Sequence, residues 1–363
     1  MPDRARRNLI KAAGAAAILQ AGAAVMASAT KKLEIIGTEE TWATPGYIKA
    51  FLRATADNPS VITKYARLFL DKPMVQAALT DIDQKIADMD RNGVDKFVLS
   101  LVGPGVQIFE AAQGTALATE VNDTLAAQIA QHPTRLAGLA AVAPQDPQGA
   151  AREIDRAIQK LGLNGVIINS HTQGEFLDDP KFWPIFEACV RNDTPLYLHP
   201  WSPREDMIGP YQKYQLFGAM AGLAHECSLH ALRIVLSGAL DVYPDLKIVL
   251  GHGGEGLPYW LFRLDDIHGL LNSMGAPDLP KLKRHPSEYI RSNFYVTLSG
   301  MFWDPVLKFC IEVMGVDRVM FAIDSPFEKT QVAADFMRNA PLSGRDKALV
   351  ASGNARRIFR LGK

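Results

Sequence analysis

Polar side chains suited to metal binding or acid–base chemistry stand directly after several short apolar runs of this sequence. The run 247–250 leads into His252, which is flanked by glycines and followed three residues later by Glu255. Glycines beside a histidine remove side-chain bulk, so a substrate or a metal ion can approach the imidazole. A single histidine of this kind can equally be buried in a loop and held by the backbone. A functional role for His252 becomes more persuasive because other apolar runs also end in polar side chains.

Further apolar runs end in carboxylates or imidazoles. These residues are Glu39 and Glu40 after the first run, and then His171, His199 and Asp324. A mixed set of nitrogen and oxygen ligands without a thiolate suits a divalent cation such as Zn²⁺ or Mn²⁺ and argues against a structural zinc knot. An open coordination position would serve substrate or water. We therefore predict one divalent metal ion and no organic cofactor.

The elements that must position these residues alternate regularly along the chain. Strands are expected at 33–40, 96–102, 136–143, 165–169, 195–198, 247–250, 293–298 and 318–323, and helices at 45–92, 117–131, 147–161, 182–191, 217–242 and 305–314. Eight such units favour an α/β fold of the closed (β/α)8 TIM-barrel type over a doubly wound sheet. In a barrel the carboxyl ends of the strands share one rim, so side chains distant in sequence converge. The first helical stretch is then an insertion after strand one.

The composition is that of a globular protein with a sizeable core. Of 363 residues, 48% are hydrophobic and 21% are charged, which is ordinary for a soluble domain. Thirty-nine basic and 39 acidic residues give no electrostatic case for nucleic acid or an anionic membrane as a partner. Three cysteines, an odd number in apolar segments, do not indicate a disulfide framework.

Residues 1–29 have the pattern of a twin-arginine signal peptide. Arg6 and Arg7 precede an Ala-rich apolar segment, which ends in the small-residue cleavage pattern Ala27-Ser28-Ala29. An amphipathic N-terminal extension is the alternative. The apolar part is too short and too weak for a membrane span. We expect export of the folded protein to the periplasm, with one barrel domain at 30–363.

Taken together, the motifs resemble the amidohydrolase-related decarboxylase family, which includes γ-resorcylate, 5-carboxyvanillate and aminocarboxymuconate-semialdehyde decarboxylases. The resemblance spans about residues 33–360. It rests on the stretches 38–40, 169–174, 198–200, 230–233, 250–255, 298–300 and 322–327. It implies an amidohydrolase-like barrel that acts on a small aromatic or unsaturated carboxylic acid.

The resemblance also implies roles for single residues. Glu39, His199 and Asp324 match the metal ligands of the family, and His252, with Glu255 behind it, matches the active-site histidine. Many members carry a second ligand, a histidine, two residues after the first. That position holds a poor ligand in this sequence, a threonine at residue 41. The departure is similar to the carboxyvanillate type with three protein ligands, and it favours Mn²⁺ over Zn²⁺.

Three further residues are candidates for substrate binding. Arg263 matches an arginine that, in the carboxyvanillate type, reaches the substrate carboxylate of the neighbouring subunit, so a homodimer or higher homo-oligomer is implied. The alternative is a solvated helix charge paired with Asp265 or Asp266. His171 would bond substrate or a neighbour of a ligand, or simply close its strand end. Phe327 would wall a flat apolar pocket, or belong to the core.

Two enzymatic hypotheses and one non-enzymatic hypothesis follow. In the first, a phenolic acid binds the metal, Asp324 protonates the ring carbon that carries the carboxylate, and Glu255 fixes the tautomer of His252. In the second, a metal-bound hydroxide attacks a lactone, ester or amide, with Asp324 or His252 as general base. The third is a binding or structural protein on the same barrel, since a fold alone does not define function.

Overall fold

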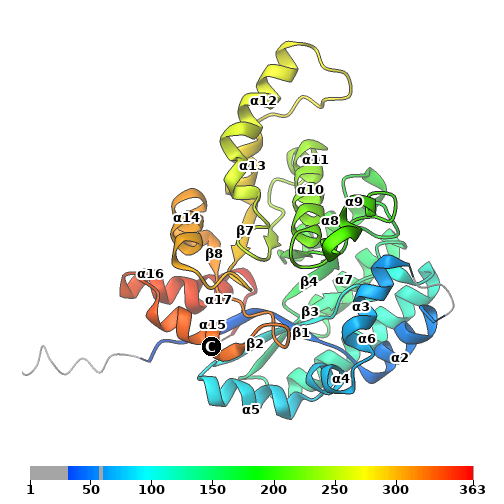
Figure 1. Cartoon of the computed structure of the whole chain (residues 1–363), viewed down its shortest axis with the longest axis vertical. Coiled ribbons are helices and arrows are strands. Elements are labelled where there is room, and N and C mark those ends of the chain that lie inside the picture. The colour runs from blue at the N-terminus through cyan, green and yellow to red at the C-terminus, as the bar shows by residue number, and fades with distance from the viewer. Residues whose placement is uncertain (1–31, 57–59, 363) are drawn as a thin grey trace, which may run out of the picture. The chain divides into compact units, whose positions relative to one another are not determined.

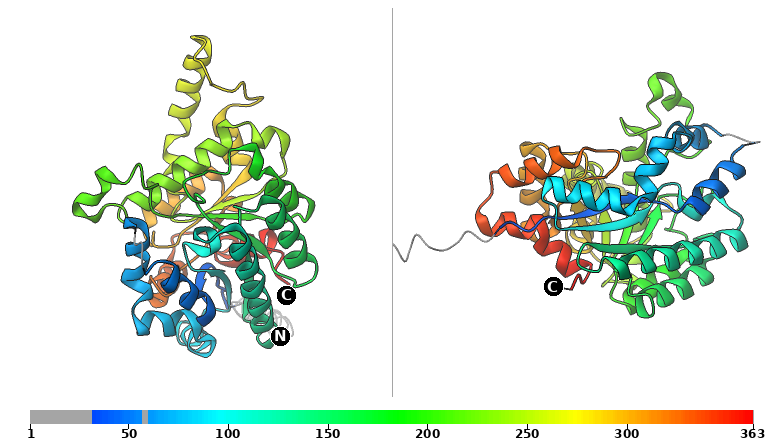
Figure 2. Two further views of the ribbon diagram at one scale, coloured as in Figure 1. Left: turned by 90° about the vertical axis from the view of Figure 1, so that its right-hand side faces the viewer. Right: turned by 90° about the horizontal axis from the view of Figure 1, so that it is seen from below.

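Eight parallel strands form one sheet whose spatial order follows the chain from β1 to β8. The protein is represented by a computed structural model that describes residues 32–56 and 60–362. Figures 1 and 2 show the strands at the centre with helices around them. The strands are β1 (Ile36–Trp42), β2 (Lys96–Leu101), β3 (Leu136–Ala141), β4 (Gly165–Asn169), β5 (Leu196–His199), β6 (Ile248–Leu250), β7 (Phe294–Thr297) and β8 (Val319–Met320). The predicted (β/α)8 barrel is confirmed.

Helices follow every strand, and four of them lie between β1 and β2, where the insertion was predicted. These four are α2 (Pro45–Ala54), α3 (Val61–Leu70), α4 (Pro73–Thr80) and α5 (Ile82–Asn92). The others are α6 (Ala111–Gln131), α7 (Pro147–Gln159), α8 (Trp183–Arg191), α9 (Gly209–Gln212), α10 (Gly222–Leu236), α11 (Ala239–Val242), α12 (Leu261–Ser273), α13 (Pro286–Asn293), α14 (Asp304–Met314), α15 (Thr330–Asn339), α16 (Gly344–Ala348) and α17 (Asn354–Ile358). Among the described residues, none of these helices has the length and apolar character that crossing a membrane requires.

Local sequence explains why the strands and helices form where they do. Strands such as β4 are buried along their whole length, as expected when helices cover a parallel sheet, so they are continuous apolar runs rather than alternating ones. Helix α7 begins with Asp146, whose side chain accepts a hydrogen bond from the N–H of Gly149, and Pro147 occupies the first turn. The same helix buries Ile154 and Ala157 against the barrel. The three cysteines are buried and free.

Two strand ends differ from the prediction, and both differences affect the site. Strand β1 continues to Trp42, so Glu39 and its neighbour lie in the middle of the strand and not at its end as predicted. The β1–β2 register also shifts between Gly37 and Glu40, which marks a β-bulge. Strand β8 is shorter than the predicted 318–323, and in the described part of the chain no strand pairing joins β8 to β1. We call the junction between β1 and residues 321–325 the seam.

Helix α12 extends away from the barrel in the views of Figures 1 and 2. Large apolar side chains at its beginning are exposed: Tyr259 at 73%, Trp260 at 50% and Phe262 at 83%. Met274, at its end, is 72% exposed. This arm therefore carries apolar surface that the barrel itself does not cover.

Candidate metal centre and active site

Four of the predicted site residues meet at the carboxyl ends of the strands. Glu39 lies in β1, His199 is the last residue of β5, His252 follows β6 and Asp324 follows β8. The Nε2 atom of His199 is 3.6 Å from Glu39 Oε1, and His252 Nδ1 is 3.9 Å from the same oxygen. On its other side, His252 Nε2 is 3.7 Å from Asp324 Oδ2. The barrel thus brings together side chains that are up to 285 positions apart in the printed sequence.

The two carboxylate oxygens of Glu39 have different surroundings. Oε2 accepts hydrogen bonds from Thr297 Oγ1, at 2.9 Å, and from Ser299 Oγ, two residues of β7 and the loop after it. Oε1 is buried and has no hydrogen-bond partner among the described residues. A β-carbon at position 251 would lie only 2.6 Å from Oε1, so Gly251 leaves this oxygen its space. One oxygen is therefore anchored, and the other faces His199 without a partner.

The electrostatics of the cluster are those of buried carboxylates facing imidazoles. Burial alone would raise the pKa of Glu39, but His252, His199 and hydrogen bonds lower it below its usual value. Burial raises the pKa of Asp324, with His252 opposing the shift. Burial alone would lower the pKa of His252, yet Glu255, Glu39 and Asp324 together raise it well above its usual value. A positive charge is thus favoured at this position in the barrel.

Glu255 orients the imidazole of His252. Its Oε1 lies 2.6 Å from His252 Nδ1, which therefore carries the hydrogen and leaves Nε2 directed toward Asp324. The loop that holds the pair is tightly wound, because His252 and Glu255 have φ angles of 49° and 55° and Gly253 and Gly254 are also left-handed. Such backbone is unfavourable for residues other than glycine and is typical of functional sites.

The donor set fits a divalent cation. No group of three or more His, Cys, Asp or Glu side chains among the described residues already stands in ligating geometry. The chemistry is nevertheless suitable: two carboxylates and one imidazole match Zn²⁺ or Mn²⁺. Glu39 Oε1 and His199 Nδ1 are buried polar atoms without a partner. A cation between Glu39, His199 and Asp324 would satisfy the buried Glu39 oxygen, which is costly to leave unpaired.

Phe327 lies beside this cluster in an aromatic wall that includes residues the sequence reasoning missed. The Phe327 ring packs edge-on against Phe69 of α3, with ring centroids 5.5 Å apart. Tyr65, one turn earlier on α3, packs edge-on against Phe69 and against Phe217. Burial raises the pKa of the Tyr65 phenol, and the charge of Asp324 adds to the rise, so this wall lies within electrostatic reach of the cluster. The four-residue spacing of Tyr65 and Phe69 was the available signal.

His171 is not part of the metal cluster. Its Nε2 is 3.1 Å from the carbonyl oxygen of Ser202, and its Nδ1 accepts a hydrogen bond from the N–H of Gly174. Both ring nitrogens are thus engaged with the backbone. This arrangement favours the interpretation that His171 closes its strand end. The residue also borders a cavity of about 550 Å³ that Trp201 and Arg204 line.

Arg263 lies on the exposed arm α12, outside the cluster. Within the described ranges it forms no ion pair or hydrogen bond, so the predicted alternative of a pair with Asp265 or Asp266 is not what the structure contains. Asp265 instead accepts hydrogen bonds from the N–H and hydroxyl of Ser287. Trp42, the last residue of β1, is fully buried and belongs to the core.

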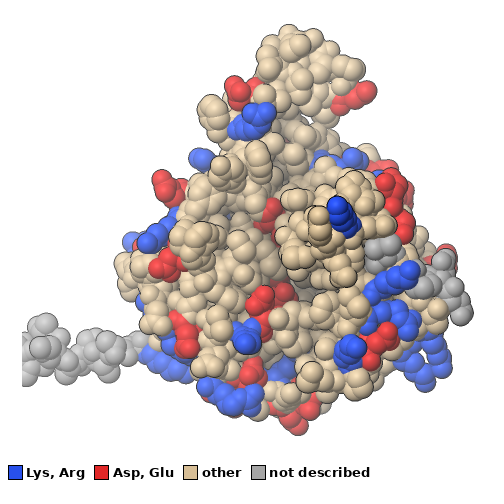
Figure 3. All heavy atoms as spheres, viewed as in Figure 1, with Lys and Arg blue, Asp and Glu red and all other residues tan. Residues whose placement is uncertain are grey.

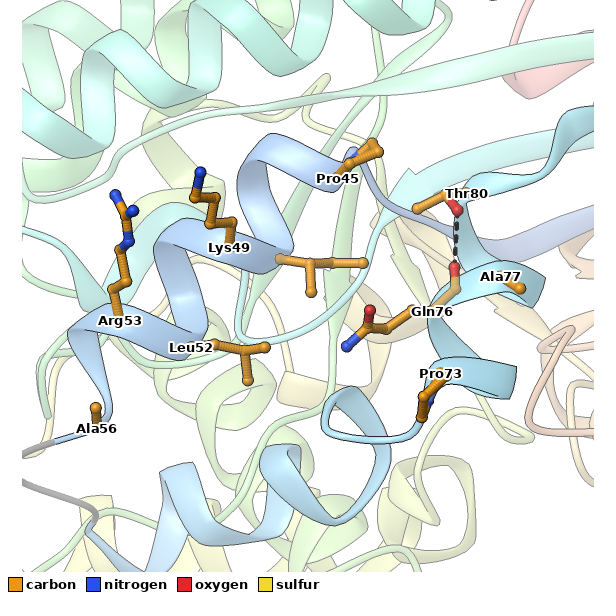
Figure 4. A pocket seen from close by; sticks show the side chains of 10 residues that line it. Pro45, Lys49, Leu52, Arg53, Ala56, Pro73, Gln76, Ala77 and Thr80 are labelled. Atoms are coloured by element: carbon orange, nitrogen blue, oxygen red, sulfur yellow. Dashed lines mark hydrogen bonds between the residues drawn. The ribbon is translucent and has the colours of Figure 1, made fainter.

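Other surface features lie apart from the cluster. A groove of about 580 Å³ lies between α2 and α4 and is lined by none of the predicted site residues. Figure 4 shows some of the side chains that line it, among them Lys49, Arg53 and Gln76. On the face drawn in Figure 3, basic and acidic side chains are interspersed and form no basic stripe.

Comparison with known proteins agrees with this geometry. The amidohydrolase family profile matches residues 73–361. A γ-resorcylate decarboxylase from Polaromonas sp. (strain JS666) is 37% identical over 302 residues, which cover 81% of this chain and 92% of that protein. The crystal structure of 5-carboxyvanillate decarboxylase from Sphingomonas paucimobilis shares 43% identity with a TM-score of 0.88, covering 91% of this chain and 100% of that chain.

A second solved relative was captured with a metal and an aromatic acid. This is the 5-carboxyvanillate decarboxylase from Novosphingobium aromaticivorans, complexed with manganese and 4-hydroxy-3-methoxy-5-nitrobenzoic acid. It shares 40% identity with a TM-score of 0.88, over 91% of this chain and 97% of that one. The similarities confirm the predicted resemblance over most of the barrel. The chain therefore belongs to the amidohydrolase family, among relatives that are metal-dependent decarboxylases of aromatic acids.

Proposed function

We propose that this protein is a non-oxidative decarboxylase of a small aromatic carboxylic acid, with one divalent cation held by Glu39, His199 and Asp324. The observation that carries the proposal is the meeting of these side chains beside the His252–Glu255 pair. A bound cation would neutralise and orient an anionic substrate. The buried Glu39 Oε1, which has no partner among the described residues, supports the ligand assignment.

Asp324 is the group best placed to deliver a proton to the substrate ring. As one of the proposed ligands, it would lie next to a substrate held at the cation. Its Oδ2 lies 3.7 Å from His252 Nε2, so a small approach would let a proton pass between the two. The proton adds to the ring carbon that bears the carboxylate. The carbon–carbon bond to carbon dioxide then breaks, and its electron pair restores the aromatic ring.

The aromatic wall gives the substrate ring a surface to pack on. Phe327 is 41% exposed, and Phe69 packs edge-on against it. A flat ring held there would lie near Asp324, which follows β8 a few residues before Phe327. Aromatic rings pair favourably in edge-on or offset contact, so this wall would select a planar acid over an aliphatic one.

Mn²⁺ is the cation we propose. Threonine at position 41 adds no strong ligand, which leaves three protein ligands, two of them carboxylates, and room for water or substrate oxygens. Oxygen-rich, more open sites suit Mn²⁺ better than the tetrahedral nitrogen and sulfur sites of Zn²⁺. The solved relative complexed with manganese supports the choice. Elemental analysis of the purified protein tests it, and zinc alone at one equivalent would contradict it.

A homodimer, with Arg263 reaching the substrate carboxylate in the partner subunit, is the assembly we propose. The support is the extended arm α12, whose exposed Trp260 and Phe262 lie beside Arg263 in the sequence. Exposed aromatic patches of this kind are typical of protein–protein interfaces. Within the described ranges Arg263 has no ion-pair partner of its own, so its charge is available to an anionic ligand.

Residues 1–29 lie outside the described residues, and we propose that they form a twin-arginine signal peptide. The support is the order of Arg6-Arg7, an apolar segment and Ala27-Ser28-Ala29 in the sequence. The mature domain would then begin at Thr30 in the periplasm. N-terminal sequencing of protein from the periplasmic fraction tests this, and an intact Met1 in the cytoplasm would contradict it.

Decarboxylation itself is tested with the manganese-loaded protein under anaerobic conditions. Release of carbon dioxide from 5-carboxyvanillate or 2,6-dihydroxybenzoate is the expected result. Asp324→Asn should lower this rate by about 100- to 10,000-fold, the usual loss when a general acid is removed. Cleavage of esters or lactones without decarboxylation of any aromatic acid would instead support the hydrolase hypothesis. An Asp324→Asn variant with full activity and metal content would contradict both assignments.

A further inference from the structure

Glu40, which follows the proposed ligand Glu39, has a fully buried side chain that binds the backbone on both sides of Asp324. Its Oε1 accepts a hydrogen bond from the N–H of Ile323, and its Oε2 accepts one from the N–H of Ser325, each at 3.1 Å. The carboxylate thus bridges the N–H groups of the residues immediately before and after Asp324. It does so across the seam, from β1 to the segment after β8.

Asp324 requires such support because its backbone is in an unfavourable conformation. Its φ angle is 75°, in the left-handed region. For a residue other than glycine this region is strained, so surrounding contacts must hold it. Strand β8 ends at Met320 and supplies no ladder to β1 within the described chain. The side chain of Glu40 takes the place of the missing ladder bonds.

The local backbone of β1 is shaped to admit this side chain. The β-bulge between Gly37 and Glu40 shifts the register of the strand against β2. A β-carbon on Gly37 would lie 2.2 Å from Glu40 Oε1, far inside contact distance. Gly37 therefore leaves the volume that the Glu40 carboxylate occupies. A bulge and a glycine that together serve one buried carboxylate indicate a specific role for it.

Lys85 of α5 supports the same arrangement from the other side. It is 4% exposed, and its Nζ donates a 2.8 Å hydrogen bond to the carbonyl oxygen of Thr41. Thr41 in turn donates its N–H to the carbonyl oxygen of Ser325, at 2.8 Å. Lys85 thus holds the backbone of β1 at the residue that is hydrogen-bonded to the segment after Asp324.

We propose that Glu40, supported by Lys85, is a positioning residue that holds Asp324 in its ligating and proton-donating orientation without touching the substrate. The inference rests on the role proposed above for Asp324. It assigns a function to a residue whose type and position suggested only a polar strand end. It also explains why two adjacent carboxylates are buried within β1: one faces the cluster, and the other fixes the opposing ligand across the seam.

The test is the manganese affinity of Glu40→Gln, measured on the purified full chain by titration followed with the Mn²⁺ electron paramagnetic resonance signal. An amide has one acceptor oxygen, and its NH₂ group would face one of the two backbone N–H donors. We expect the affinity to fall by about 10- to 100-fold, as for other groups that orient metal ligands. Glu40→Asp keeps both carboxylate oxygens on a shorter side chain. Its manganese affinity should lie between that of Glu40→Gln and that of the unaltered protein.

Glu153→Gln is the matched control. Glu153 is also a buried carboxylate that accepts side-chain hydrogen bonds, from Asn122 and Arg156, but it lies on α7 away from the seam. The Glu153→Gln protein should lose thermal stability and keep its manganese affinity. Asp324→Asn, measured in parallel, separates this inference from the proposed function. If Asp324→Asn loses manganese and Glu40→Gln binds it as the unaltered protein does, the positioning role is wrong while the ligand assignment stands.

A second variant covers the case in which Glu40→Gln does not fold. Lys85→Met removes the charge and the hydrogen bond to Thr41 but leaves the Glu40 carboxylate in place. It should weaken manganese binding several-fold and change the EPR line shape at metal saturation. With saturating metal, a fall in kcat at unchanged KM is expected, since the substrate contacts are intact. A Lys85→Met protein with unaltered affinity and line shape would overturn the inference.

Discussion

Individual residues at this site are defined as much by what holds them as by their own chemistry. One carboxylate oxygen of Glu39 is anchored by Thr297 and Ser299, and the other faces His199. In His252, likewise, Nδ1 is hydrogen-bonded to Glu255 and Nε2 points toward Asp324. One end of each side chain is fixed so that the other is directed into the cluster. Such preorganisation is what metal binding and proton transfer both require.

The meeting of the ligands was predictable from the sequence, whereas their supports were not. Glu39, His199, His252 and Asp324 each end or follow an apolar run, and the barrel geometry then requires them to converge. The role of Glu40 depends on a bulge and on strand pairing absent from the seam, and neither leaves a sequence pattern. His171 ends its strand like the others, yet two backbone groups hold its ring. Strand-end position alone therefore does not separate ligands from structural residues.

His230 gives a prediction about stability and pH. Burial lowers its pKa well below the usual 6.5, with His171 and Arg233 adding to the shift. Its Nε2 accepts a hydrogen bond from the N–H of Leu177, so Nδ1 carries the hydrogen and donates to Ser170 Oγ. Protonation would place a second N–H against that of Leu177. The folded state therefore resists protonation, and the contribution of His230 to stability is present above pH 6.5 and lost as the pH falls toward its folded-state pKa.

The expected magnitude is about 1.4 kcal/mol of unfolding free energy per pH unit below 6.5, until the folded-state pKa is reached. His230→Gln keeps an acceptor and a donor but cannot titrate. Urea unfolding at pH 7.5, 6.5 and 5.5 should therefore show a steeper acid loss in the unaltered protein than in the variant. If the unfolding free energies of the two proteins fall equally with pH, His230 does not make this contribution.

Among the elements, α3 and α12 carry what the barrel strands do not. Helix α3 brings Tyr65 and Phe69 to Phe327, and α12 carries the exposed Phe262 and Arg263 outward. Helical spacing predicted that the insertion after β1 is helical, because its apolar residues recur with that period. Which face of an inserted helix meets the site is set by tertiary packing and not by the period. The sequence therefore showed these helices without showing which of their residues serve the site.

A subunit-mixing experiment tests the arm α12. If Arg263 acts in the partner subunit, Arg263→Ala and Asp324→Asn proteins should each be inactive alone. In mixed dimers one of the two sites receives Arg263 and Asp324 together, because in a twofold dimer each site takes one residue from each chain. Random mixing should then restore about a quarter of the activity of the unaltered protein. No recovery despite confirmed subunit exchange would place Arg263 within its own subunit or outside catalysis.

At the scale of the whole molecule, the cation would join the first and last strands of the barrel. Glu39 lies on β1 and Asp324 follows β8, on opposite sides of the seam. Binding to the folded state alone stabilises a protein by about 2.7 kcal/mol when free metal is a hundredfold above its dissociation constant. The seam, which has no strand pairing in the described chain, is where this stabilisation would act.

Metal removal should therefore lower the thermal stability of the protein. Dialysis against a chelator is expected to reduce Tm by several degrees, and added Mn²⁺ should restore it. Asp324→Asn should show little difference between chelated and metal-loaded samples. Calorimetry of the unaltered protein and of Asp324→Asn, each with chelator and with metal, checks this. If the chelator does not change the Tm of the unaltered protein, no cation stabilises the seam.

The order of the ligands along the chain has a consequence for biosynthesis. Asp324 lies 285 positions after Glu39, so it leaves the ribosome long after Glu39 does. The complete set of ligands exists only when all eight strands have been made and β1 lies beside the segment after β8. Binding of the metal ion would then require a fully folded barrel. For a chain that we propose to be exported after folding, loading would be a natural final checkpoint before departure from the cell interior.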